Sequence, residues 1–184
     1  MKTTNPVNRS GFTLVELLAV MVIVALLAGV LSPVLQQAIE KSRSIACAAN
    51  LRTIGSAVQL YLQDNNNNFP IIEPYPSSPV YPPGQGVTGM LDVLGPYGVV
   101  AKTLQCPTDM HANNWYVQEG SSYMWCPLAD GENQNAVTLY GRRVHLLKSL
   151  SRLSMCSDFT SASGVGPHSG KINTLYADGH VLAR

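Results

Sequence analysis

Three side chains near the C-terminus are of the types that bind metal ions or transfer protons: His168, Asp178 and His180. Imidazole and carboxylate groups are zinc ligands, so these residues predict one candidate zinc or catalytic site. Asp158 and Asp178 are a second candidate set, because calcium prefers carboxylate oxygens. A strand between His168 and Asp178 would hold them roughly 20 Å apart, since each strand residue adds about 3.3 Å. We therefore favour a structural interpretation, in which Asp178 and Gly179 form a turn and His168 caps a loop or hydrogen-bonds to its polar groups.

No nucleophile and base pair stands out in the sequence, and there is no glycine-rich phosphate loop, since Gly84-Gln85-Gly86 lies in the Pro-rich loop without a strand before it. The formal net charge is +1, without a basic stripe, which argues against nucleic acid as a partner. We expect a protein that is not an enzyme and requires no cofactor, with Ca²⁺ as an option. The alternative is a membrane-anchored envelope enzyme or metal-binding module that uses His168 and Asp178.

Glu16 is unusual because it is the only charged residue between Arg9 and Glu40. The segment from Leu17 to Ile39 has no charge, and about 20 apolar residues suffice to cross a bilayer. A carboxylate in hydrocarbon costs at least a few kcal/mol, so Glu16 needs a partner. A cleaved secretory signal would have a shorter apolar core. A plain membrane anchor accounts for the length of the segment but not for Glu16.

The stretch Ser10-Gly11-Phe12-Thr13-Leu14-Val15-Glu16, with the basic leader before it, resembles the processing site of type IV prepilins and type II secretion pseudopilins. In that family the prepilin peptidase, a membrane aspartyl peptidase, cuts after the glycine and methylates the new amine. The resemblance implies a cut between Gly11 and Phe12. It further implies that Glu16 pairs with the Phe12 amine of a neighbouring subunit during assembly, which makes the charge less costly. Pro33 stands where such proteins commonly break the lipid-embedded helix.

The same resemblance implies a structural subunit of a type IV pilus-like or type II secretion pseudopilus filament. Its partners would be the prepilin peptidase, other pilin or pseudopilin subunits and the inner-membrane assembly platform. The chain would cross the inner (cytoplasmic) membrane once, with its C-terminal head in the periplasm or outside. The implied fold is α+β and pilin-like: one long N-terminal helix, half transmembrane and half amphipathic, packed on a small antiparallel β-sheet head.

Five segments follow from these patterns: a leader peptide (1–11), a transmembrane helix (12–35), an amphipathic helix continuing it (36–64), a Pro-rich loop region (65–103) and a C-terminal β-rich head (104–184). Apolar side chains recur on one face of the second helical segment at Cys47, Leu51, Ile54, Val58 and Tyr61. The asparagines at 65–68 end that helix, because asparagine tolerates the left-handed conformation and favours turns.

Six prolines between positions 70 and 83 exclude a helix or central strand, and we favour an ordered surface loop over a flexible linker. Residues 90–94 predict a short helix. Strands are predicted at 122–125, 136–140 and 171–177, with Asp178-Gly179 as a tight turn and 180–182 returning. Residues 144–150 are consistent with either a helix or a strand.

Three further stretches resemble a pseudopilin subfamily abundant in Planctomycetes and Verrucomicrobia. The first is CAANLRTIGSAVQLYLQDNNNNFP, which begins at Cys47, and the second is a C-terminal signature of His168, nine residues, then Asp178-Gly179. LQCPTD at 104–109 resembles the Cys-Pro-Ser-Asp segment of this subfamily. Major pseudopilins of type II secretion bind calcium in a C-terminal loop, which is what the resemblance adds for Asp158 and Asp178.

The four cysteines all follow the apolar segment, so export would permit disulfides. Cys47 begins the apolar helix face, and Cys106 stands where the chain returns from the Pro-rich loop. We therefore predict a Cys47–Cys106 disulfide, with Cys126–Cys156 as the second. The main alternative is a local Cys106–Cys126 disulfide, with Cys47 as a small buried side chain.

Overall fold

The computed structural model describes residues 13–82, 84–109, 114–135, 138–139, 142–143, 150–159 and 166–184. The chain divides into two units, Met1–Ile39 and Glu40–Arg184, and the second unit is called the head below. The predicted processing junction, Gly11 and Phe12, lies outside the described residues. Most of the ambiguous segment 144–150 also lies outside them.

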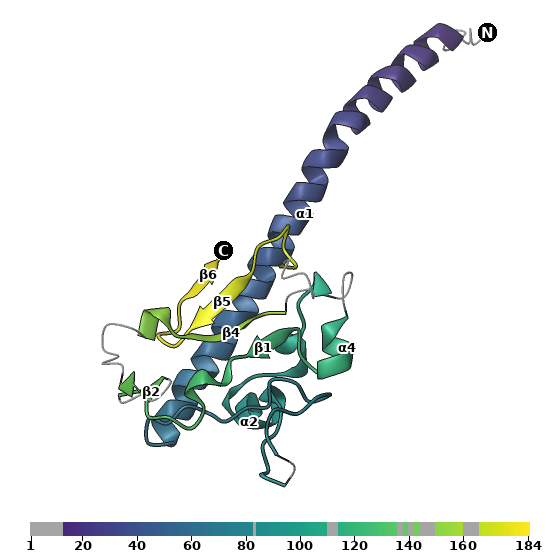
Figure 1. The fold of residues 1–184 in the computed structure, drawn as a ribbon. Helices are drawn as coiled ribbons and strands as arrows, with labels where there is room; N and C mark the ends of the chain where they lie inside the picture. The colour runs from purple at the N-terminus through teal and green to yellow at the C-terminus, as the bar shows by residue number, and fades with distance from the viewer. Residues whose placement is uncertain are drawn as a thin grey trace, which may run out of the picture. The chain divides into compact units, whose positions relative to one another are not determined.

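One helix, α1 (Leu14–Asp64), runs through both units (Figure 1). The helix continues through Pro33, where the resembling proteins commonly break it, so the predicted continuation of the first helical segment into the second is confirmed. A proline removes one backbone donor and crowds the preceding turn, which a long helix can accommodate without ending. The helix ends as predicted, since Asn66 and Asn67 follow it in the left-handed conformation, with φ of 55° and 61°.

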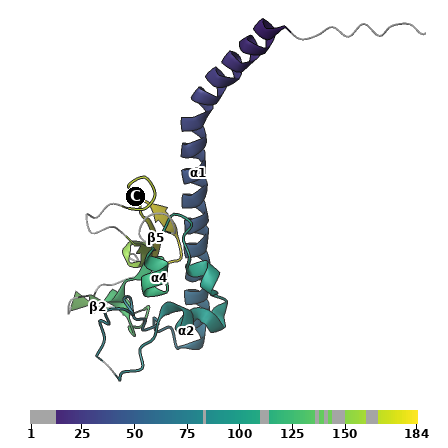
Figure 2. The ribbon, with the colours of Figure 1, turned by 90° about the vertical axis from the view of Figure 1, so that its right-hand side faces the viewer.

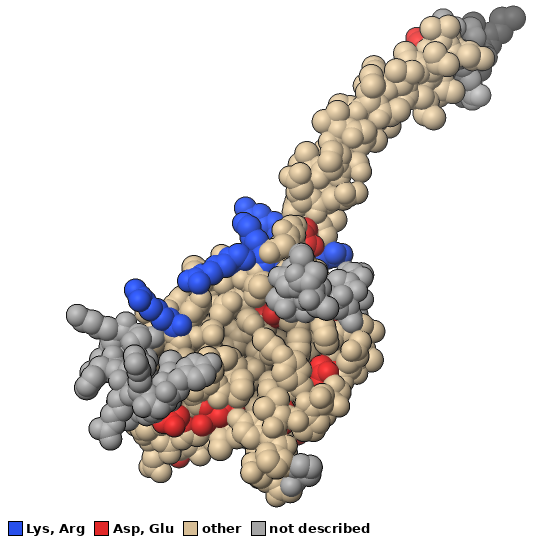
Figure 3. All heavy atoms as spheres, viewed as in Figure 1, with Lys and Arg blue, Asp and Glu red and all other residues tan. Residues whose placement is uncertain are grey.

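Side chains of the first unit make no internal core: those described, from Thr13 to Ile39, are all exposed. By length and composition, α1 is a candidate for crossing a membrane near the N-terminus. The space-filling view shows this unit as almost entirely free of charged side chains along its described length (Figure 3). An exposed apolar surface of this extent is typical of a site that contacts a membrane or another protein.

The head contains a four-stranded antiparallel sheet in the order β1-β4-β5-β6. Its strands are β1 (Tyr123–Trp125), β4 (Ser154–Asp158), β5 (Asn173–Tyr176) and β6 (Val181–Ala183). A second, two-stranded sheet pairs β2 (Thr138–Leu139) with β3 (Arg142–Arg143). The fold is thus α+β, with one long N-terminal helix and a small antiparallel sheet, a pilin-like arrangement.

Short helices connect these strands and the loop region. They are α2 (Met90–Leu94), α4 (Trp115–Glu119) and the 3-10 turns η1 (Gly95–Tyr97), η2 (Ala101–Leu104), η3 (Pro127–Ala129) and η5 (Leu150–Arg152). The predicted helix at 90–94 is confirmed, and the predicted strands at 122–125 and 171–177 contain β1 and β5. β4 was not predicted, because Ser-Met-Cys-Ser-Asp has neither β-branched nor aromatic residues.

The head core forms between the sheet and the second half of α1, which lie side by side in both views (Figures 1 and 2). Cys47, Leu51, Ile54 and Val58 are buried, which confirms the predicted helix face. A Cβ added to Gly55 would lie 2.8 Å from a Leu175 methyl group. Glycine at that position therefore lets α1 approach β5 closely.

One buried and one partly buried carboxylate, Glu73 and Asp130, hold the described part of the Pro-rich segment in place. Glu73 accepts hydrogen bonds from the backbone N–H groups of Val80, at 2.8 Å, and Tyr81, at 3.1 Å. Asp130 accepts from Trp125 Nε1 and from the Tyr81 hydroxyl, each at 2.6 Å. Burial raises the pKa of Asp130, although these donors partly offset it. These contacts fit the prediction of an ordered loop; those of Glu73 are local, whereas the one between Tyr81 and Asp130 joins residues 49 positions apart.

Candidate functional site

A tight hairpin presents His168 to the interior of the head. Isolated antiparallel bridges join Gly166 to Gly170 and His168 to Lys171. Ser169 and Gly170 turn the chain with φ of 52° and 84°. A Cβ on Gly166 would overlap the Lys171 carbonyl group, so only glycine allows this close return of the backbone.

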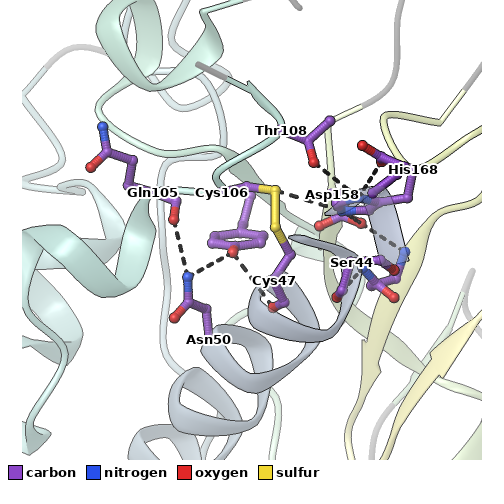
Figure 4. A network of polar contacts seen from close by, with 11 residues as sticks. Ser44, Cys47, Asn50, Gln105, Cys106, Thr108, Asp158 and His168 are labelled. Atoms are coloured by element: carbon purple, nitrogen blue, oxygen red, sulfur yellow. Dashed lines mark hydrogen bonds and ion pairs between the residues drawn. A yellow bond between two sulfur atoms is a disulfide. The ribbon is translucent and has the colours of Figure 1, made fainter. Parts of the chain in front are cut away.

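The His168 side chain lies among polar atoms from several parts of the head, and the residue is only 3% exposed. Its Nε2 is 3.3 Å from Asp158 Oδ2 and 3.5 Å from Cys106 Sγ. Its Nδ1 is 3.2 Å from Thr108 Oγ1 and 3.3 Å from Glu40 Oε1. Figure 4 shows the contacts with Cys106, Thr108 and Asp158. One imidazole therefore connects α1, the segment after η2 and β4.

Two carboxylates determine the protonation of this imidazole. Burial lowers the pKa of His168, but hydrogen bonding and charge attraction from Asp158, and then from Glu40, raise it by more, and the net shift is upward. The positively charged form is therefore favoured between the two carboxylates. Asp158 Oδ2 also accepts a 2.8 Å hydrogen bond from the backbone N–H of Asn173, which fixes the carboxylate at the start of β5.

A disulfide beside His168 joins Cys47 to Cys106, with a Cα–Cα distance of 5.2 Å, so the first predicted pairing is confirmed. The second is wrong, because Cys126 and Cys156 are free. Cys156 lies opposite Trp125, whereas the Cys126 N–H bonds to the Met155 carbonyl, one position away. Successive strand side chains point to opposite faces, so this offset does not bring the sulfur atoms into bonding geometry.

The free thiol of Cys156 is held in its protonated, uncharged form. Burial, followed by the neighbouring Asp158 and Cys126, raises its pKa well above the ordinary value. The neutral thiol therefore predominates near pH 7, and Cys156 acts as a small apolar side chain.

Asp178 lies apart from His168, as the length of the predicted strand between them implied. It lies beyond the end of β5, where Gly179, with φ of 90°, makes the predicted tight turn. Its Oδ1 is 2.5 Å from Nδ1 of the exposed His180, whose ring stacks on Tyr176 at 4.4 Å. The candidate zinc set of His168, Asp178 and His180 is therefore not assembled.

The calcium set of Asp158 and Asp178 is also wrong as a single site. Asp158 bonds to Asn173 at the start of β5, and Asp178 lies five positions further along, roughly 16 Å away for an extended chain. One cation cannot bind both carboxylates. The carboxylates that contact His168 are instead Asp158 and Glu40, which no local motif identified, because they approach the hairpin only in the folded head.

The four residues Cys47, Cys106, Asp158 and His168 form a compact cluster of potential metal ligands. All four are buried, and one ligand atom from each lies within 4.8 Å of the others. Asp158 Oδ1 is buried without a hydrogen-bond partner among the described residues. In the disulfide state the two sulfur atoms are bonded to each other, so neither can bind zinc as a thiolate.

Glu16, in the first unit, helps to cap the N-terminus of α1. Its Oε2 accepts hydrogen bonds from the Thr13 backbone N–H, at 2.9 Å, and from the Thr13 hydroxyl, at 2.7 Å. The Glu16 N–H donates back to Thr13 Oγ1 at 3.3 Å. These contacts make a capping box, which the Thr-x-x-Glu spacing would have revealed but which the sequence interpretation missed.

A family model for the prokaryotic N-terminal methylation motif matches residues 7–32. The motif supports a type IV pilin-like protein. The match covers the predicted junction of Gly11 and Phe12, the capping-box residues and most of the apolar segment. No match was found among curated proteins or solved structures.

This motif implies processing by a prepilin peptidase and points to a structural subunit. Together with the exposed apolar helix, it is consistent with a pilin anchored in a membrane. It does not extend to the head, so neither the subfamily with the C-terminal signature nor a role for His168 follows from it.

Proposed function

We propose that the protein is a structural subunit of a type IV pilus-like or type II secretion pseudopilus filament. The prepilin peptidase would cut between Gly11 and Phe12 and methylate the Phe12 amine. The processed subunit would stay in the inner membrane, with its head outside the cytoplasm, until assembly. The assembly platform would then add it to other pilin or pseudopilin subunits. The observation that supports this proposal best is the methylation motif at residues 7–32, which overlaps the start of an exposed apolar helix at Leu14.

The exposure of the first unit supports a change of surroundings during assembly. Its described side chains, from Thr13 to Ile39, are exposed in the single chain and nearly all uncharged. Such a surface can be accommodated in lipid, and also by packing against the same surface of other subunits. A filament built around this helix would therefore exchange one apolar environment for another.

The capping box sharpens the proposed role of Glu16. Both hydrogen bonds from Thr13 end on Oε2, and a neutral glutamine oxygen can accept the same bonds. The cap by itself therefore does not require a charge in an apolar segment. In the proposed filament the charge pairs with the methylated Phe12 amine of the neighbouring subunit and fixes the register between adjacent helices.

Processing is tested by mass spectrometry of protein extracted from membranes of cells that contain a prepilin peptidase. We expect a mature N-terminus at Phe12, heavier by one methyl group. Gly11→Leu is the control variant and should retain the leader. An N-terminus at Met1, or one beyond residue 30, in the unmodified protein would contradict the proposal.

Assembly is tested with two variants that separate the cap from the charge. Glu16→Gln keeps the capping geometry and removes the charge, whereas Thr13→Ala removes the cap and keeps the charge. When each is the only source of the subunit, we expect Glu16→Gln to insert into the membrane but fail to form filaments. Thr13→Ala should still assemble. The reverse result would show that helix capping, and not charge pairing, explains Glu16.

A further inference from the structure

Two sulfur atoms, a carboxylate and an imidazole converge inside the head from separate elements. Cys47 comes from α1, Cys106 follows η2, Asp158 ends β4 and His168 comes from the hairpin before β5 (Figure 4). Their ligand atoms lie within 4.8 Å of one another. Neighbouring ligand atoms of a tetrahedral zinc ion are about 3.5 Å apart, so the cluster has nearly the size of a zinc site.

The disulfide alone does not explain the polar groups around it. A covalent S–S bond needs no polar neighbours, and burial of a carboxylate and an imidazole is costly unless both are satisfied. Asp158 Oδ1 has no hydrogen-bond partner among the described residues and is buried. A buried acceptor without a donor, beside three other potential ligands, is the environment that a cation would satisfy.

Glu40 supplies a second feature of zinc sites. His168 Nε2 faces Asp158 and Cys106, whereas Nδ1 is 3.3 Å from Glu40 Oε1. A zinc-binding histidine usually gives its other ring N–H to a carboxylate, which fixes the ring and strengthens it as a ligand. The imidazole is thus already oriented with one nitrogen toward the cluster and the other toward a carboxylate.

We propose that the reduced head binds one zinc ion through Cys47, Cys106, Asp158 and His168. A dithiol reductant would supply two electrons and two protons, converting the disulfide to two thiols while the reductant itself becomes a disulfide. Zinc then binds both sulfur atoms as thiolates and His168 through neutral Nε2, and the displaced protons go to solvent. Glu40 positions His168 and does not touch the metal.

Cys47 and Cys106 would join α1 to the segment after η2 both as a disulfide and, when reduced, through the zinc ion. In an oxidising compartment the disulfide links α1 to the segment after η2. Before oxidation, zinc would link these two elements and also β4 and the His168 hairpin. The head could then keep α1 on its sheet before the disulfide forms.

The test uses the full chain in detergent micelles, with Cys126→Ser and Cys156→Ala to remove the other thiols. Cobalt(II) is the probe, because tetrahedral thiolate coordination produces intense visible bands and a sulfur-to-metal charge-transfer band. After reduction with a phosphine and removal of oxygen, we expect one cobalt ion per chain, displaced by one zinc ion. The oxidised protein should show neither band.

Variants assign the ligands. His168→Ala and Asp158→Asn should each weaken cobalt binding at least tenfold, and Glu40→Gln should weaken it by about 10- to 100-fold, as outer partners of metal ligands do. His180→Ala, which alters the exposed Asp178–His180 pair, is the matched control and should bind as the parent does. Circular dichroism establishes that each variant is folded.

The comparison of reduced and oxidised parent protein requires no substitution in the cluster, so it is informative even if a variant fails to fold. Absence of tetrahedral cobalt bands in the reduced parent would overturn the proposal. Equal binding by the reduced parent and a folded His168→Ala variant would also overturn it. Neither result would affect the proposed filament function, which rests on processing and on Glu16.

Discussion

Glu16 and Asp158 are carboxylates in opposite environments. Glu16 is exposed on the apolar first unit and is bonded to Thr13 in the same helical turn. Asp158 is 1% exposed and contacts His168 and the backbone of Asn173, both distant in sequence. Glu16 is thus bonded within its own helical turn and stays exposed, whereas Asp158 Oδ2 is bonded to parts of the head that are distant in sequence.

This contrast shows where each unit obtains its stability. The head has a buried core and a disulfide that spans 59 residues of sequence, so its stability depends on long-range contacts. The described part of the first unit has only its own helical hydrogen bonds and its cap. Substitutions should accordingly change unfolding of the head and assembly of the first unit, and the following predictions test that division.

The largest expected effect on folding comes from the disulfide. Replacing both Cys47 and Cys106 by alanine should lower the free energy of unfolding of the head by about 4 kcal/mol, because the closed loop spans 59 residues. Urea unfolding of the full chain in detergent, with a chelator present, measures the change. Cys126→Ala, at a free cysteine, is the control and should cost far less. A loss below about 1 kcal/mol for the double variant would show that the head does not depend on this linkage.

The two Asp–His pairs of the head should differ strongly in their contributions to stability. Asp158→Ala should cost about 3 kcal/mol, because it leaves His168 and the Asn173 N–H without their buried acceptor. Asp178→Ala, in the exposed pair with His180, should cost less than 1 kcal/mol. Urea unfolding of both variants provides the comparison. Equal losses would contradict the view that burial determines the strength of these contacts.

One substitution, glycine to alanine, should have different effects in the two units. Gly166→Ala should destabilise the head by about 2 kcal/mol, because its Cβ would overlap the Lys171 carbonyl. Gly29→Ala should leave head stability unchanged, since nothing lies within 4 Å of its Cβ. Thermal unfolding of each variant checks this difference. A neutral Gly166→Ala variant would mean that the His168 hairpin can rearrange without loss.

The stability of the head should depend on pH through His168, whose pKa is raised above its ordinary value near 6.5. The folded state binds this proton more tightly than the unfolded state. The added stability is therefore fully present below pH 6.5 and lost as pH rises through the raised pKa. Urea unfolding between about pH 6 and pH 9 should show this loss, and His168→Gln should remove it. Glu16→Gln is the control from the first unit, and the same pH dependence in His168→Gln would exclude His168 as its source.

The smallest expected effect is that of calcium. Asp158 and Asp178 lie at opposite ends of β5, so millimolar calcium should not shift the thermal midpoint through a shared site. A rise in the midpoint that Asp158→Asn and Asp178→Asn each abolish would contradict this placement.

Sequence alone identified the features that depend on neighbouring residues or on a regular period. These include the Gly11-Phe12 processing motif, the apolar span with Glu16, and the helix face that buries Cys47 and Leu51. Helical periodicity and short motifs are local properties, so they can be recognised without knowing the rest of the fold. The Cys47–Cys106 pairing was also predictable, because only the order of helix, loop and sheet was needed.

Only the tertiary structure revealed β4 as a central strand, the pairing of Asp158 with His168, and Cys126 and Cys156 as free thiols. None of these has a local signature. β4 lacks strand-favouring residues, and a strand register must be known to one residue before opposing cysteines can be assigned. Asp158 and His168 meet because the sheet and a tight hairpin bring them together, and burial then gives their contact its strength.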